Sequence, residues 1–205
     1  MKPMRRALPL LVLGVLFAAP ATVAAHGTDA PAPTFPAVLF AWSIDPLVVV
    51  TLVAVGLAYG WAVRRVNRAH ASNPHPGYRS WLFGGGLVTI GVALMSPIEA
   101  YEGLLFSVHM VQHMLLELIA APLLLAGAPI TLALRVSRPS VRRRLLAVLQ
   151  SRVVHVIAFP VVAWVLFAAV NWGWHFSVLY NDALENVLLH YLQHATFLGA
   201  ALLFW

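Results

Sequence analysis

Two matched histidine pairs lie inside apolar segments of the sequence. His109 and His113 form the motif His-x-x-Gln-His in one segment, and His190 and His194 form the same motif in a later one. Residues four apart lie on one face of an α-helix, about one turn from each other. Imidazole is the commonest metal ligand in proteins and suits copper, zinc, iron and nickel. Two such pairs facing each other would supply four nitrogen ligands to a metal ion.

Other side chains in the motifs add to this candidate metal site. Gln112 and Gln193 are placed to orient the imidazole rings. Met110 and Met114 are neighbours of the first pair, and thioethers are soft ligands that favour Cu(I). Methionine is also a common filler of apolar cores. Because the chain has no cysteine, histidine and methionine are its only soft or borderline metal ligands.

Three further residues are candidates for binding or proton transfer. His175 follows a tryptophan-rich stretch typical of a membrane interface, where it would help to capture a metal ion. Glu117 continues the ridge of the first histidine pair and is expected to be protonated, to pair with a polar neighbour or to relay protons. His26 would become the N-terminal residue after cleavage behind Ala25, where its amine and imidazole together could chelate a metal ion.

The composition places these histidines in a membrane protein. The 205 residues are 61% hydrophobic and 10% charged, whereas average soluble domains are about 45–50% apolar and about 25% charged. The mean hydropathy of +0.84 excludes an ordinary soluble domain and a disordered chain. The absence of cysteine excludes disulfides and a thiol nucleophile.

Five long apolar segments predict an all-α, polytopic transmembrane bundle. Each approaches or exceeds the roughly 20 residues that cross a bilayer. Kinks are expected at Pro122 and Pro160, and the glycines at 84–86 predict close helix packing. The predicted membrane helices are 46–63, 80–97, 103–127, 153–172 and 183–205, and a short basic amphipathic helix or a plain loop is predicted over 140–150.

The N-terminal sequence predicts a signal peptide over residues 1–25. A basic start precedes an apolar stretch at 7–19 and a small-residue cleavage site at Ala25. An uncleaved anchor is the alternative. An external segment, 26–44, and a transmembrane domain, 45–205, would follow. The apolar end at Trp205 suggests either a helix that just reaches the inner face or a chain truncated before further helices.

Arginine placement predicts the orientation of the bundle. The loops at 64–79 and 133–152 hold arginines, whereas the connections at 98–102 and 173–182 hold only acidic charges. The positive-inside rule makes the arginine loops cytoplasmic and the mature N-terminus external, in a bacterial plasma membrane. The net charge of +6 therefore indicates topology and gives no reason to invoke nucleic acid. Both histidine motifs would begin about 10 Å below the external ends of two parallel helices.

Four titratable residues are expected to be solvated in connecting loops. Glu99 and Glu102 would lie at the external surface, where an acidic turn attracts cations. His70 and His75 would lie in the cytoplasmic loop and are assigned no role.

Several of these blocks together match a known family pattern. They are residues 95–99, 109–115, 121–124 and 127–129, with Trp174, His175, Leu179, Tyr180, His190, His194, Phe204 and Trp205. Over roughly 40–205 the chain resembles the CtaG family of assembly factors for caa-type cytochrome c oxidases. The family usually continues with two more helices. Its members typically have Pro near position 177, an acid near 193 and an apolar residue at 117.

The resemblance implies a non-enzymatic membrane protein that binds or delivers copper during oxidase assembly. Its partner would be the oxidase subunit that carries a copper centre. The working residues would be His109, His113, His190 and His194, followed by His175. Two alternatives use the same histidines. One is a b-type membrane cytochrome holding a single haem b, and the other is a copper transporter or channel.

Overall fold

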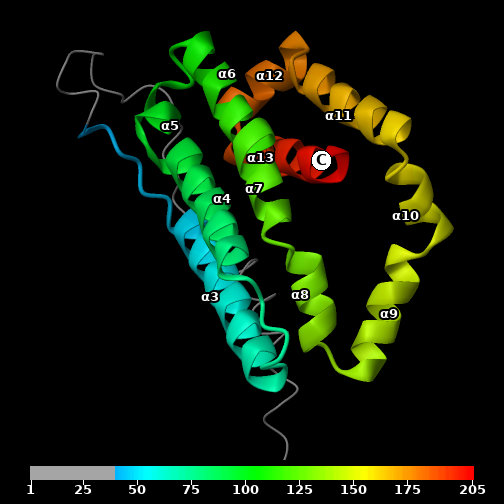
Figure 1. The fold of residues 1–205 in the computed structure, drawn as a ribbon. Coiled ribbons are helices and arrows are strands. Elements are labelled where there is room, and N and C mark those ends of the chain that lie inside the picture. The colour runs from blue at the N-terminus through cyan, green and yellow to red at the C-terminus, as the bar shows by residue number, and fades with distance from the viewer. Residues whose placement is uncertain (1–39) are drawn as a thin grey trace, which may run out of the picture.

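The computed structural model describes residues 40–205, apart from the side chains of Ser177 and Leu184. The predicted signal peptide, residues 26–39 of the external segment and His26 lie outside the described residues. Residues 40–205 form helices and connecting turns, with no strand among them, which confirms the all-α class (Figure 1).

Two long helices form an antiparallel pair along one side of the bundle. They are α3 (Pro46–Ala69) and α4 (Gly77–Met95) (Figure 1). Asp45 caps α3, because its carboxylate accepts the backbone N–H groups of Leu47 at 2.7 Å and Val48 at 3.3 Å. The helix extends six residues beyond the predicted end at 63 through a polar, arginine-bearing segment. Apolar periodicity therefore located the membrane-embedded part of α3 but not its polar end.

The third predicted helix is divided into several parts. A short α5 (Pro97–Tyr101) precedes α6 (Phe106–Met114), the π-helix η1 (Leu115–Ala120), α7 (Ala121–Ala126) and α8 (Pro129–Val136). The wide turn of η1 lies directly before Pro122, which has no N–H to donate. Here the Ala121 N–H bonds to the carbonyl of Leu116. The carbonyl of Glu117 instead accepts the indole N–H of Trp205 at 2.9 Å. The expected distortion at Pro122 is therefore a π-helical turn.

Two glycines allow α4 and α7 to pack closely. A Cβ at Gly86 would lie 2.8 Å from Cγ of Leu124, and one at Gly127 would lie 2.7 Å from Cβ of Phe83. Neither space admits a side chain, so the predicted role of the glycine run in helix packing is confirmed at Gly86. Ala128, at φ 51°, then turns the chain between α7 and α8.

The prediction of one continuous membrane helix over 153–172 is wrong, because two helices, separated at 158–159, occupy this segment. Pro160 lies at the first turn of a new helix, because proline fits the start of a helix better than its interior. The basic helix predicted over 140–150 is present, and none of its residues is buried. The elements in this part of the chain are α9 (Pro139–Leu149), α10 (Arg152–Ile157), α11 (Pro160–Trp174), α12 (Ser177–Glu185) and α13 (Val187–Phe204).

Four helical stretches in residues 40–205 are long and apolar enough to cross a membrane. The 15-residue α11 is apolar but shorter, and at about 1.5 Å per residue it measures roughly 22 Å, less than the hydrocarbon thickness of about 30 Å. The four stretches are Pro46–Ala69, Gly77–Tyr101, Phe106–Val136 and Val187–Phe204.

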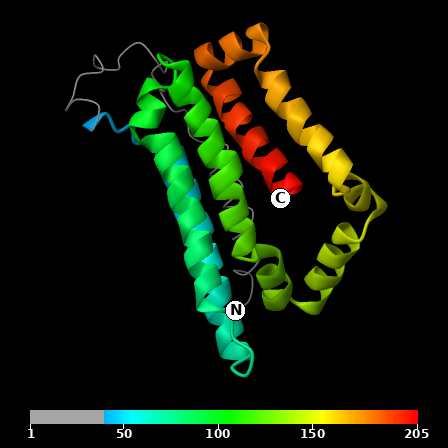
Figure 2. The ribbon, with the colours of Figure 1, turned by 45° about the horizontal axis from the view of Figure 1, so that its top comes forward.

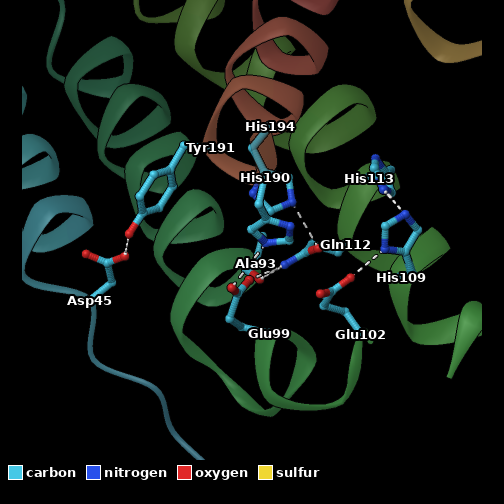
Figure 3. A network of polar contacts seen from close by, with 10 residues as sticks. All are labelled: Asp45, Ala93, Glu99, Glu102, His109, Gln112, His113, His190, Tyr191 and His194. Atoms are coloured by element: carbon cyan, nitrogen blue, oxygen red, sulfur yellow. Dashed lines mark hydrogen bonds and ion pairs between the residues drawn. The ribbon is translucent and has the colours of Figure 1, made fainter. Parts of the chain in front are cut away.

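The last helix, α13, lies at the centre of the bundle. It packs between α11 on one side and η1 and α7 on the other (Figure 2). Phe197 and Ala201 on this helix are fully buried. The hydroxyl of Tyr191 donates to the carboxylate of Asp45, so the cap of α3 also ties α3 to α13 (Figure 3).

The two arginine loops lie together at one end of the bundle. A guanidinium N–H of Arg135 donates to the carbonyl of Asn73 and joins the two loops. The short helices α5 and α12 lie at the opposite end (Figure 1). Basic and acidic connections are therefore separated to opposite ends, as the sequence predicts.

The prediction that His75 is solvated is wrong. His75 is buried. The hydroxyl of Tyr59 donates to the carbonyl of Gly127 at 2.8 Å. Because that hydroxyl has only one proton, it accepts the Nε2–H of His75 at 2.9 Å. Burial lowers the pKa of His75, and the charges of Arg79 and Arg135 lower it further. His75 therefore anchors the loop between α3 and α4 to the end of α7.

The positions of the loops lead to a test of orientation in this cysteine-free chain. Gly103→Cys, in the turn between α5 and α6, should react with a membrane-impermeant thiol reagent added to intact cells. Ser72→Cys, in the arginine-bearing loop, should react only after the membrane is permeabilised. Labelling yield by mass spectrometry is the measurement. The reverse pattern would place the arginine loops outside and contradict the predicted orientation.

Candidate functional site: a buried cluster of histidines and carboxylates

The four motif histidines are buried together where α5, α6 and α13 meet (Figure 3). His109 begins the first motif at the fourth residue of α6, and His190 begins the second at the fourth residue of α13. Each motif thus starts about 4.5 Å into its helix, nearer the helix end than predicted. Both motifs begin at the same position in their helices. With His175 of α11, these residues are called the histidine cluster.

In the α6 half of the cluster, hydrogen bonds join Glu102, His109 and His113 in a row. Nδ1 of His109 lies 2.5 Å from Oε2 of Glu102. Nε2 of His109 and Nε2 of His113 share one hydrogen bond, with 2.7 Å between the two nitrogens. Nδ1 of His113 is buried and has no hydrogen-bond partner among the described residues.

His175, the residue after α11, is oriented by a hydrogen bond to the last turn of that helix. Its Nδ1–H donates to the backbone carbonyl of Asn171 at 2.6 Å, because a carbonyl only accepts. The side-chain amide of Asn171 donates to Oε1 of Glu117 at 2.9 Å. Nε2 of His175 is buried, and within residues 40–205 it also has no hydrogen-bond partner. The polar neighbour expected for Glu117 is Asn171.

Gln112 joins the two helices that carry the motifs. Its amide NH₂ group donates to Oε2 of Glu99 at 2.5 Å and to the carbonyl of Ala93 at 2.9 Å. Its amide oxygen accepts the Nε2–H of His194 at 3.1 Å. On α13, Nε2 of His190 lies 3.4 Å from Oε1 of Glu99. One side chain of α6 therefore connects α4, α5 and α13, which fulfils the predicted orienting role of Gln112.

The structure brings all five predicted histidines together. The ring centroid of His113 lies 4.2 Å from that of His109, 5.6 Å from that of His175 and 6.1 Å from that of His194. The rings of His190 and His194 are 4.3 Å apart. His113 thus lies at the middle of the histidine cluster.

Glu99 and Glu102 were not expected in the site, and the prediction that they are solvated is wrong. Both are buried and bond to cluster residues. They stand three residues apart at α5, so one helical turn directs both carboxylates to the same side. The pattern Ser96-x-x-Glu99 is a helix N-terminal motif and was the available signal for a structured turn.

Some predicted or neighbouring residues have other environments. Met114 is 52% exposed and Met110 is half-buried, so the methionines do not share the enclosure of the histidines. Gln193 is buried, and its amide atoms have no partner in the described part of the chain. Tyr180 of α12 packs edge-on against His109 with 5.2 Å between centroids. Burial raises the pKa of Tyr180, and the Glu102 carboxylate adds to the increase.

The donor set of the cluster fits a borderline metal ion. The cluster offers five imidazoles, and the carboxylates of Glu102 and Glu99 lie against two of them, His109 and His190. Two imidazoles bound to one ion at metal–nitrogen distances of about 2 Å have centroids roughly 5–6.5 Å apart, and the His113 and His175 rings are 5.6 Å apart. Among residues 40–205, no three His, Asp or Glu side chains are already grouped as ligands of one ion. Side chains would therefore rotate on binding.

Comparison with known proteins identifies the family. The family described as cytochrome c oxidase caa3 assembly factor (Caa3_CtaG) matches residues 57–205, so this chain belongs to it. All five residues of the histidine cluster lie inside the matched region.

Curated relatives come from mycobacteria. Uncharacterized proteins of Mycobacterium bovis and Mycobacterium tuberculosis are each 31% identical over 180 residues, which cover 84% of this chain and 27% of the relative. One from Mycobacterium leprae is 29% identical over 164 residues, covering 74% of this chain and 25% of the relative. The chain therefore spans about a quarter of the length of the curated relatives it matches. No solved structure matches it.

The two glutamines of the motifs provide a matched test of the network. Gln112→Met removes one hydrogen-bond partner from each of three buried polar groups, and each lost hydrogen bond costs about 0.5–1.5 kcal/mol, or more where the group is charged. We expect Gln112→Met to lower the free energy of unfolding by at least about 2 kcal/mol. Gln193→Met should change it by less than about 1 kcal/mol, because its amide is unpaired within the described residues. Unfolding in detergent is the measurement, and equal effects would contradict the assigned bonds.

Proposed function

We propose that this chain is a non-enzymatic assembly factor for a cytochrome c oxidase of the caa3 type, and that the histidine cluster holds copper as cargo. Family membership supports the assembly role. The partner would be the oxidase subunit that receives copper.

The observation that carries the copper proposal is a pair of buried imidazole nitrogens, Nδ1 of His113 and Nε2 of His175, that have no hydrogen-bond partner among the described residues. In the neutral tautomers protonated at Nε2 of His113 and Nδ1 of His175, both nitrogens carry lone pairs. A buried acceptor without a partner costs free energy, roughly 1–3 kcal/mol for each group. A metal ion satisfies such lone pairs without adding a proton, and neutral imidazole is the form that binds it.

The charges around the cluster favour a cation. Glu99 and Glu102 are buried there, and each lies against a cluster histidine, Glu99 beside His190 and Glu102 beside His109. Burying a carboxylate is costly unless an opposite charge or hydrogen bonds compensate. Copper bound by the histidines would supply that positive charge. Glu102 would then orient His109 as a carboxylate partner that does not touch the metal.

The location of the cluster suits transfer outside the cytoplasm. It lies at the end of the bundle opposite the arginine loops, which the positive-inside rule assigns to the cytoplasm. Copper would therefore be held near the external face of the plasma membrane. His175, which follows the last residue of α11, and Tyr180 of α12 lie at that end, where a partner subunit would approach.

Loss of single histidines tests the copper proposal. His113→Ala or His175→Ala should weaken copper binding roughly 100-fold or more, because removing a ligand costs more than the 10–100-fold typical of its orienting partners. His155→Ala, at an exposed position of α10, should bind copper as the unmodified protein does. Competition titration of purified metal-free protein with Cu(I) and with Cu(II) is the measurement.

The same preparation separates the alternatives. Unchanged affinity in both cluster variants would contradict the copper site. A Soret band in the visible spectrum would identify a haem protein instead. Copper accumulation in liposomes containing the protein would indicate a transporter.

A double-mutant cycle tests whether the two motifs form one site. If His113 and His194 bind the same ion, removing either ligand disrupts the coordination. Removing the other ligand afterwards should then lower copper affinity by less than its removal from the unmodified protein does. We expect the sum of the single effects to exceed the double effect by more than about 0.5 kcal/mol. The copper affinities of His113→Ala, His194→Ala and the double variant provide the test. Additive losses would indicate two separate sites.

A further inference from the structure

A second candidate binding site lies at the opposite end of the bundle from the histidine cluster. A groove of about 1060 Å³ runs between the C-terminal half of α3 and the junction of α8 and α9. Five arginines line it, and we call it the arginine groove. They are Arg64, Arg65, Arg68, Arg135 and Arg138.

The arginine groove has a charged end and an apolar end. The apolar end is formed by Gly56, Leu57, Gly60 and Trp61, which lie inside the membrane-spanning stretch of α3. Trp61 is 58% exposed, with the guanidinium of Arg65 5.9 Å from its ring centroid. From Gly56 to Arg65 the helix rises about 14 Å, close to half of the roughly 30 Å hydrocarbon thickness.

A second groove continues the apolar surface on the other flank of α3. It holds about 320 Å³ between α3 and α4, and it shares Gly56, Gly60 and Arg64 with the arginine groove. A Cβ at Gly60 would meet no atom within 4 Å, so this glycine leaves open space where the two grooves meet. Two surface grooves with apolar walls thus meet beside one cluster of arginines.

The charge of the arginine groove is uncompensated within the described chain. The ion pairs of residues 40–205 join histidines to Glu99 and Glu102 at the other end, and none involves an arginine. Guanidinium groups bind phosphate oxygens through paired N–H donors. A ligand with one phosphate and two apolar chains would match both parts of the surface.

We propose that the arginine groove binds one anionic glycerophospholipid, with its phosphate among the arginines and its acyl chains along Gly56 and Gly60. Basic pockets between membrane helices on the cytoplasmic side are typical sites for anionic headgroups. The lipid would fill the space between α3 and the α8–α9 junction and hold those elements together. This site is separate from copper binding, so the two proposals stand or fall independently.

The test uses the full chain purified in detergent, depleted of lipid and then supplied with phosphatidylglycerol. We expect one bound phosphatidylglycerol by native mass spectrometry and a rise in Tm. Phosphatidylcholine and inorganic phosphate should give neither. A response to inorganic phosphate equal to that of phosphatidylglycerol would overturn the lipid site in favour of a free-anion site. A dimer formed without lipid would assign the groove to a second copy of the chain.

Charge-matched variants locate the site. Arg65→Gln with Arg138→Gln removes two groove arginines, and we expect phosphatidylglycerol affinity to fall roughly 30-fold. Arg142→Gln with Arg143→Gln removes two charges from α9 outside the groove and should leave the affinity within about two-fold. Equal losses in the two pairs would show diffuse attraction to a basic surface and overturn the proposal.

A glycine pair tests the acyl channels separately from charge. Gly60→Leu should fill the junction of the two grooves without a clash and weaken phosphatidylglycerol binding at least ten-fold. Gly199→Leu on α13 is the control, since a Cβ there also meets no atom within 4 Å and the residue lines neither groove. Unchanged lipid binding in Gly60→Leu would overturn the placement of the chains. Both variants should keep the helical circular dichroism spectrum and the size-exclusion elution of the unmodified protein, which shows that they are folded.

Discussion

The structure depends on the need to satisfy two carboxylates buried among apolar helices. Glu99 and Glu102 lose their hydration at the start of α6, and their partners are the residues of the two His-x-x-Gln-His motifs. Gln112 is central to this arrangement, because one amide bonds to α4, α5 and α13 at once. In a bilayer the apolar surfaces of helices gain little by leaving lipid, so such directional bonds help to select how the helices assemble.

The same bonds set the chemistry of the histidine cluster. Glu102 and the carbonyl of Asn171 each hold an Nδ1–H, on His109 and His175 respectively. These acceptors orient the two rings, and the proposed metal ion would need their other nitrogens unprotonated. Glu117 supports this from the π-helical turn, where it accepts a bond from Asn171. The π-helical turn before Pro122 thus begins two residues after His113.

The two ends of the bundle are specialised in opposite ways. Histidines and carboxylates are enclosed at one end, whereas arginines line an open groove at the other. Glycines shape the helix packing away from the histidine cluster. Gly86 and Gly127 bring α4 and α7 into contact, and Gly56 and Gly60 leave space beside α3. Cargo binding and lipid contact are therefore proposed for surfaces that share no residue.

The sequence by itself determined the helical class, the histidine motifs and the separation of charged loops, because hydropathy and the spacing of four residues are local properties. The motifs also allowed the family to be recognised, and His175 was identified from its neighbours. Tertiary structure decided what depends on distant contacts. It buried Glu99, Glu102 and His75, which sequence reasoning placed in water. It divided the helix predicted over 153–172 at Pro160 and left Met114 outside the cluster. A residue's type gives its possible partners, but only the packing of α13 against α6 and α11 determines which of them it meets.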